Sequence, residues 1–173
     1  MAAAGCLIVA SIVFTAESAA SWKISQNEAL RGDYYYLTPP IRELIEDLLY
    51  RRFYTSEEQL ARAVFDWVVE NIRYEDFCGA VTATRVFENR KGKCSGQARL
   101  LIAMAQDFGL DARYVLVDRD CNGKQVKHAC AWVRIDGRGC LLDPAYKMFD
   151  AGHQTWRMVS DTPGRLMLAM GNK

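Results

Sequence analysis

The chain has 173 residues, of which 50% are hydrophobic, and this is enough to build one globular domain with a sizeable core. Its 22 basic and 21 acidic residues give a net charge of +1. Without a basic stripe, this charge balance argues against nucleic acid as a partner. No internal repeat is visible in the sequence.

Residues 1–20 differ in composition from the rest of the chain. They contain an apolar run over residues 7–14 and a single charge, Glu17. Small residues at 18–20 fit cleavage after Ala20, so we predict a signal peptide and a secreted or periplasmic location. No Lys or Arg precedes the apolar run, which departs from the usual signal pattern. The alternatives are an uncleaved N-terminal anchor, which would make the membrane a partner, and a wrongly assigned start of the sequence. We expect residues 21–173 to form a single domain.

The cysteines bear on both redox state and metal binding. Removal of Cys6 with the signal peptide leaves five of the six cysteines, an odd number that fits one free nucleophile and up to two disulfides. The chain has no CxxC pair and only two histidines, so a structural zinc site is not expected. We predict no cofactor and no metal.

Three helices are predicted after a lead-in over residues 21–39. The second begins at a capping box in residues 55–59. The third is short and runs from Thr84, as its N-cap, to Asn89. The apolar faces expected to be buried are Ile41, Leu44, Ile45, Leu48 and Leu49 in the first helix and Leu60, Val64, Trp67, Val68 and Ile72 in the second.

A fourth, buried helix is the centre of the predicted fold. It opens close to Ser95 and ends at Gly109, a typical C-cap residue. Cys94 lies at the mouth of this helix, where unpaired N–H groups carry partial positive charge and favour a thiolate. Residues 90–93 add three basic side chains with the same effect. Most single cysteines are small core residues, but this placement makes Cys94 a candidate nucleophile.

Past this helix the hydrophobic period changes to two, which predicts antiparallel strands. The expected strands are 113–118, 125–135 and 139–143, joined by turns at 121–124 and 136–137. The tail from Met148 has no firm pattern. The sequence therefore predicts an α+β fold in which helices precede a sheet.

The Asp136–Gly137 turn fixes the register of the second hairpin. It pairs Ile135 with Arg138, Val133 with Cys140, and Cys130 with Asp143. Because side chains alternate, one face carries His128, Cys130, Trp132 and Asp143, and the other, expected to pack on the helices, carries Ala129, Ala131, Val133, Cys140 and Leu142. Cys130 and Cys140 then lie on opposite faces, so we predict no disulfide between them. If any disulfide forms, we favour Cys78 with Cys121, since both lie in loops.

The same register selects three residues for chemistry. The register places His128 and Asp143 diagonally on adjacent strands, where a histidine and a carboxylate can reach hydrogen-bonding distance. The carboxylate would fix the imidazole tautomer, and the imidazole would take the proton of Cys94 if this face meets the helix mouth. His128 alone would be read as a structural histidine; together the three residues predict a catalytic triad. The Cys94 N–H is a natural oxyanion donor, and Tyr74 and Trp132 are further candidates for the oxyanion site or cleft.

These blocks resemble the transglutaminase-like core over about residues 60–146. The resemblance is carried by Trp67-x4-Ile72-x-Tyr74, Gly92-x-Cys94, Gly109-Leu110-x-Ala112-Arg113-Tyr114-Val115, His128-Ala129 and Asp143-Pro144. It implies a papain-like α+β fold, with Cys94 as nucleophile, His128 as general base and then acid, and Asp143 as the orienting group. Animal transglutaminases tend to have Trp after the nucleophile, where this chain has Ser95. Calcium-dependent bacterial relatives carry acidic residues at the places of Lys93 and Ser95, so calcium is not expected.

The resemblance implies thiol-dependent acyl transfer at amide bonds of a protein or peptide substrate. Our first interpretation is an exported cysteine peptidase, because a short chain without an evident acyl-acceptor site lets water reach the thioester. The alternatives are a protein-glutamine transglutaminase, which cross-links or deamidates, and a catalytically silent peptide-binding module.

Overall fold

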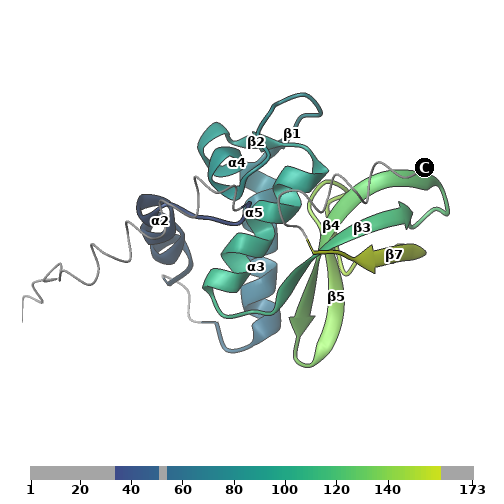
Figure 1. Ribbon diagram of the computed structural model, residues 1–173. Helices are drawn as coiled ribbons and strands as arrows, with labels where there is room; N and C mark the ends of the chain where they lie inside the picture. Colours follow the sequence, from purple (N-terminus) through teal and green to yellow (C-terminus); the bar gives the residue numbers. More distant parts are fainter. Residues whose placement is uncertain (1–33, 51–53, 161–173) are drawn as a thin grey trace, which may run out of the picture.

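The fold has a helical layer packed against an antiparallel sheet (Figure 1). The computed structural model describes residues 34–50 and 54–160. The expected signal peptide, Cys6 and the end of the C-terminal tail lie outside the described residues. An α+β architecture is thus confirmed.

The helical layer follows the sequence patterns closely. Its elements are α2 (Pro39–Tyr50), α3 (Glu57–Asn71), α4 (Ala83–Asn89) and α5 (Cys94–Asp107). The predicted cap of α3 is confirmed, since the Ser56 side chain accepts from the Gln59 N–H. The Gln59 side chain accepts from the N–H of Thr55, one residue before the N-cap. The structure differs from the prediction in the exposure of Leu44, whereas Ile41 and Ile45 are buried as predicted.

The buried face of α3 is slightly rotated from the expected one. Val64, Val68 and the cap residue Ile72 are buried as predicted, together with Ala61 and Phe65. Leu60 and Trp67 are only partly buried. The Trp67 ring stacks on Phe87 of α4, at 5.3 Å between ring centroids.

The start of α4 corrects a prediction. Thr82, not Thr84, is the N-cap, because its side chain accepts from the Arg85 N–H. The Thr84 hydroxyl instead donates to the Tyr36 carbonyl at 2.6 Å. Two threonines two residues apart offer the same cap chemistry, and this tertiary hydrogen bond decides between them.

The sheet has five strands in the order β6-β5-β4-β3-β7. Their bounds are β3 (Ala112–Arg119), β4 (Gln125–Ile135), β5 (Arg138–Asp143), β6 (Met148–Phe149) and β7 (Thr155–Met158). The predicted register is confirmed, with Ile135 opposite Arg138 and Val133 opposite Cys140. Both Asp136 and Gly137 have positive φ, as a two-residue type I′ turn requires. The tail without a pattern contributes β6 and β7, one at each edge.

The two faces of the sheet belong to two hydrophobic clusters. The inner face packs with α5 in the main core and includes Ala129, Ala131, Val133, Cys140 and Leu142, as predicted. The outer face holds a smaller cluster that includes Val115, Val117, Cys130 and Leu141. Cys130 and Cys140 therefore point to opposite sides. Cys78, Cys94, Cys121, Cys130 and Cys140 are all free thiols in the described structure.

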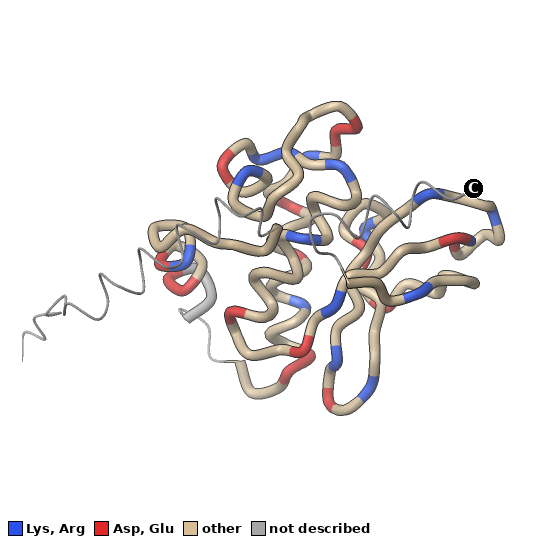
Figure 2. Tube along the Cα trace, viewed as in Figure 1, with Lys and Arg blue, Asp and Glu red and all other residues tan. Residues whose placement is uncertain are grey.

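Charge is spread over both layers of the fold. Figure 2 shows basic and acidic positions scattered along helices, loops and strands, in keeping with the small net charge. Within residues 34–50 and 54–160, no helix has the length and apolar character needed to cross a membrane.

Candidate active site

Cys94 is the first residue of α5, as the sequence predicted. The preceding residue, Lys93, has extended backbone and makes no side-chain capping bond, so the helix mouth keeps its free N–H groups near the thiol. A Cβ on Gly96 would lie 2.8 Å from the Ala80 carbonyl oxygen and 2.9 Å from the Val86 side chain. The absence of a side chain at Gly96 therefore allows the first turn of α5 to pack closely against the segment that leads into α4.

A short pair of parallel strands precedes Cys94 in the site. Strand β1 (Arg73–Tyr74) pairs with β2 (Lys91–Gly92), which runs directly into Cys94. The buried Gln97 amide in α5 donates to the Ile72 carbonyl at 3.1 Å, which joins α5 to the end of α3. These contacts bring Tyr74 to the same end of the molecule as the thiol.

His128 and Asp143 meet as the register predicted. The Nε2 atom of His128 lies 2.6 Å from Oδ2 of Asp143, and both side chains are buried. Because Nε2 is bonded to the carboxylate, Nδ1 is the ring nitrogen left for the thiol. Cys94 and His128 are hydrogen-bonded through their side chains. The structure therefore brings Cys94, His128 and Asp143 together in one chain of hydrogen bonds.

The hydrogen bonds and charges within the Cys94–His128–Asp143 group favour a thiolate beside an imidazolium. Burial raises the pKa of Cys94, but the hydrogen bond and charge of His128, with backbone hydrogen bonds from Ser95 and Ala129, bring it below its ordinary value. Burial lowers the pKa of His128, but Asp143 and Cys94 outweigh it and raise the pKa to about 9. Burial also raises the pKa of the Cys130 thiol, and the nearby charges of Asp143 and Cys94 raise it further.

A second histidine completes the site and was not found from the sequence. Nε2 of His153 lies 2.8 Å from the same Asp143 oxygen that His128 contacts. Tyr146 contacts both members of the pair: its backbone N–H donates to Oδ1 of Asp143, and its ring centroid lies 4.7 Å from that of His128. His153 lies in the tail that has no pattern, and the only sequence signal was that it is the second of two histidines.

The two further candidates for the oxyanion site or cleft are placed differently. Tyr74 is 46% exposed and interacts electrostatically with Cys94, but its hydroxyl donates to Asp76 at 2.7 Å. The Trp132 indole lies over Gly139, where a Cβ would overlap the ring. Trp132 therefore packs on the outer cluster, four residues along β4 from His128, and is not brought to the thiol.

His128, Asp143 and His153 also offer three potential metal ligands within 4.8 Å of one another. Their nitrogen–oxygen separations of 2.6 and 2.8 Å are those of hydrogen bonds. Ligands around a tetrahedral zinc ion lie about 3.3 Å apart, given bonds of about 2.0–2.1 Å. The arrangement therefore fits a carboxylate with two N–H donors better than an ion site.

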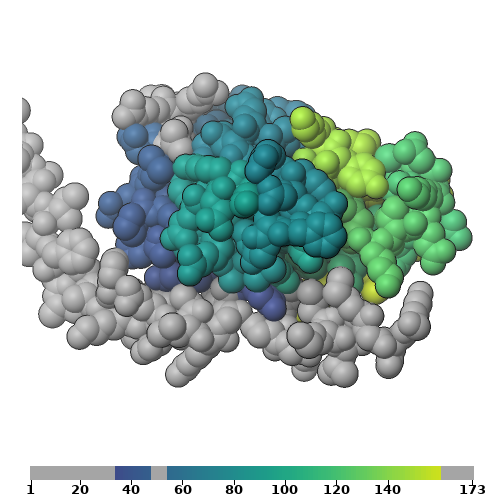
Figure 3. Space-filling model, turned by 90° about the horizontal axis from the view of Figure 1, so that it is seen from above, coloured from purple at the N-terminus to yellow at the C-terminus, as the bar shows by residue number. Residues whose placement is uncertain are grey.

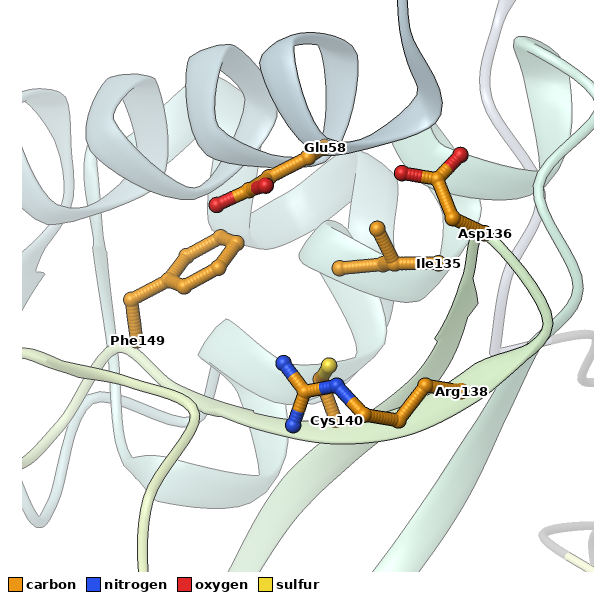
Figure 4. A pocket seen from close by; sticks show the side chains of 6 residues that line it. All are labelled: Glu58, Ile135, Asp136, Arg138, Cys140 and Phe149. Carbon is orange, nitrogen blue, oxygen red and sulfur yellow. The ribbon is translucent and has the colours of Figure 1, made fainter.

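A small pocket of about 240 Å³ lies elsewhere (Figure 4). Its lining consists of Glu58, Ile135, Asp136, Arg138, Cys140 and Phe149. Ile135 is at the opposite end of β4 from His128, roughly 23 Å away at about 3.3 Å per residue. This pocket therefore takes no part in the chemistry of Cys94.

In the view from above, the teal surface of the helical layer adjoins the green and yellow surface of the sheet (Figure 3).

Comparison with known proteins agrees with this geometry. The family model described as the transglutaminase-like superfamily matches residues 49–144, a range that contains Cys94, His128 and Asp143. The chain belongs to the transglutaminase-like superfamily. No curated protein matches the chain.

Two solved structures share the transglutaminase-like fold with this chain. One is a candidate cysteine protease from Cytophaga hutchinsonii, with TM-score 0.52 and 17% identity. The other is a candidate protease from Parabacteroides distasonis, with TM-score 0.51 and 15% identity. The matches cover 70% and 72% of this chain but only 46% and 26% of those proteins. At these identities, the likeness concerns the fold alone.

Proposed function

We propose that this protein is an exported cysteine peptidase that hydrolyses amide bonds in a protein or peptide. The observation that carries the proposal is the hydrogen-bonded chain Cys94–His128–Asp143, in which the pKa of the thiol is lowered and that of the imidazole is raised to about 9. A thiolate available near neutral pH is the nucleophile that such chemistry needs.

The reaction follows from the positions of these groups. The Cys94 thiolate attacks the carbonyl carbon, and the carbonyl electron pair moves to the oxygen, which the Cys94 N–H at the helix mouth stabilises. The carbon–nitrogen bond then breaks as His128 gives its proton to the leaving amine, which leaves a thioester. Water attacks the thioester while His128 takes its proton, so that the acid is released and the thiolate returns. Asp143 keeps the imidazole oriented throughout.

Transglutamination is the second candidate and uses the same thioester. An amine would then replace water as the acyl acceptor, and a glutamine side chain would be the donor. We rank hydrolysis first because no acyl-acceptor site stands out among residues 34–50 and 54–160. The third candidate, a silent peptide-binding module, is disfavoured because all three triad residues are present and in contact.

The decisive experiment is intact mass spectrometry with a peptide that carries a thiol-directed acyloxymethyl ketone in place of the scissile amide. Wild type should gain the mass of one probe less its carboxylic acid leaving group, and Cys94→Ala should gain none. Cys121→Ala removes another partly buried thiol and should label like wild type. A wild type that stays unlabelled, while iodoacetamide still reaches Cys94, would support the silent module.

Two further measurements separate the other parts of the proposal. Incubation of a glutamine-containing protein with a fluorescent primary amine should give peptide fragments and little amine incorporation; efficient incorporation would instead support cross-linking. Export is tested by expressing the full chain and sequencing the N-terminus of the mature product. A protein that begins after Ala20 is expected, and an intact Met1 in a membrane fraction would support the anchor.

A further inference from the structure

Asp143 accepts hydrogen bonds from two histidines at one oxygen. His128 reaches Oδ2 at 2.6 Å from β4, and His153 reaches it at 2.8 Å from the segment just before β7. An ionised carboxylate can only accept, so each histidine carries a hydrogen on Nε2. His128 already has a role in the proposed reaction. His153 has none.

The carboxylate depends on these donors because water does not reach it. The Asp143 and His153 side chains are both fully buried. The donors to Asp143 are the two imidazoles and, at Oδ1, the Tyr146 N–H at 3.1 Å. A buried carboxylate stays ionised only where hydrogen bonds replace its lost hydration. His153 therefore supplies one of the two imidazole donors that stabilise the anion facing His128.

His153 is held in place from both sides of its loop. The Ala151 N–H donates to the Leu141 carbonyl at 2.7 Å, and the Gln154 N–H donates to the Arg119 carbonyl at 3.1 Å. The segment between these anchors carries His153, whose ring contacts Asp143. The contact of His153 with the carboxylate is thus built into the chain path and is not a chance approach of a surface side chain.

The bond to Asp143 is the hydrogen bond that the His153 ring makes. Nδ1 is buried and has no hydrogen-bond partner among the described residues. The orientation of the ring is therefore set through Nε2, with the ring centroid 5.9 Å from that of His128. The other titratable groups that face this cluster are Cys130, Tyr146 and Asp120.

We propose that His153 is a positioning residue of the site, acting on the thiol through Asp143 and His128. Its Nε2–H holds the Asp143 carboxylate by a hydrogen bond in the position that faces His128, and the carboxylate in turn stabilises the imidazolium beside the Cys94 thiolate. A role for His153 in catalysis rests on the proposed function. Its effect on the Cys94 thiol can be measured without a substrate.

The test compares His153→Leu, which removes the donor, with His153→Gln, whose side-chain amide can still donate from a similar place. The readout is the second-order rate of Cys94 alkylation by iodoacetamide between pH 4 and pH 10, followed by peptide mapping. In His153→Leu the midpoint of the acid limb should rise by about 1 pH unit, a tenfold loss of thiolate below that midpoint, because a hydrogen bond to a charged group is removed. His153→Gln should stay close to wild type.

Wild-type alkylation in His153→Leu, or an equal shift in both variants, would overturn the role of the donor. Amide hydrolysis measured in parallel keeps the two proposals apart, since a wild type with a reactive Cys94 but no hydrolysis counts against the peptidase alone. If His153→Leu does not fold, the wild-type protein still decides. With only two histidines, ¹⁵N-histidine spectra resolve each ring, and we expect a hydrogen on Nε2 of His153. A His153 ring without a hydrogen on Nε2 would overturn the proposal.

Discussion

Replacing Asp143 by asparagine tests the electrostatic account of the site most directly. The change keeps the shape of the side chain and removes its charge. In the wild type, the surroundings raise the pKa of His128 from 6.5 to about 9, which corresponds to about 3 kcal/mol in favour of the imidazolium. Burial alone lowers this pKa, so the loss of the carboxylate should bring the pKa of His128 well below 9.

The loss should be visible at the thiol. In the wild type, Cys94 should react with iodoacetamide as a thiolate, which is paired with the imidazolium from the lowered pKa of Cys94 up to about pH 9. Asp143→Asn should slow this reaction at pH 7 by about ten- to a hundredfold, the value of a hydrogen bond to a charged group. The assay is the rate of mass gain against pH, with Cys94→Ala as the blank.

The pH dependence of the free energy of unfolding gives an independent check, because the direction of the change is known. The folded-state pKa of His128 lies above its unfolded value of 6.5, so its contribution is fully present below pH 6.5 and is lost as the pH rises through about 9. The difference in unfolding free energy between wild type and Asp143→Asn should be largest near pH 6 and shrink, by on the order of 2 kcal/mol, towards pH 10. Identical alkylation and unfolding profiles for the two proteins would refute the reasoning.

Three further outcomes are expected. At pH 7, peptide mapping should find iodoacetamide on Cys94 and not on Cys130, whose pKa is raised by burial; equal labelling would contradict the assigned charge state. Tyr74→Phe should change turnover by less than about threefold, because the hydroxyl is bonded to a carboxylate; a loss of about 10²–10³ would make it an oxyanion donor. Gly96→Ala should lower the free energy of unfolding in urea by about 1–3 kcal/mol through overpacking, whereas Gly152→Ala, with no atom near its added Cβ, should change it little.

Much of the fold follows from local sequence because the signals are local. The Asp136–Gly137 turn selects one hairpin geometry, and the alternation along β4 then assigns each side chain to a face. The capping residues at the start of α3 need only their own neighbours to form. These features are short-range, so the sequence determines them before any long-range contact exists.

The edges of the fold depend on partners that the sequence does not indicate. Strands β6 and β7 have two and four residues, too few for a hydrophobic period, and they exist because β5 and β3 offer free hydrogen-bonding edges. The choice of Thr82 over Thr84 as a cap has the same origin, since a carbonyl 48 residues away binds the Thr84 hydroxyl.

In the candidate site, too, some features follow from the local sequence and others depend on tertiary contacts. The sequence by itself predicted the three residues of the proposed triad: Cys94 from its helix mouth, and His128 and Asp143 from the register of one hairpin. Only the tertiary structure decided that His153 returns to the same carboxylate, and that the Tyr74 hydroxyl is bonded to a nearby carboxylate. Neither contact follows from a helical or strand period. Loop paths set both of them, and loop paths are fixed by packing of the whole chain and not by neighbouring residues.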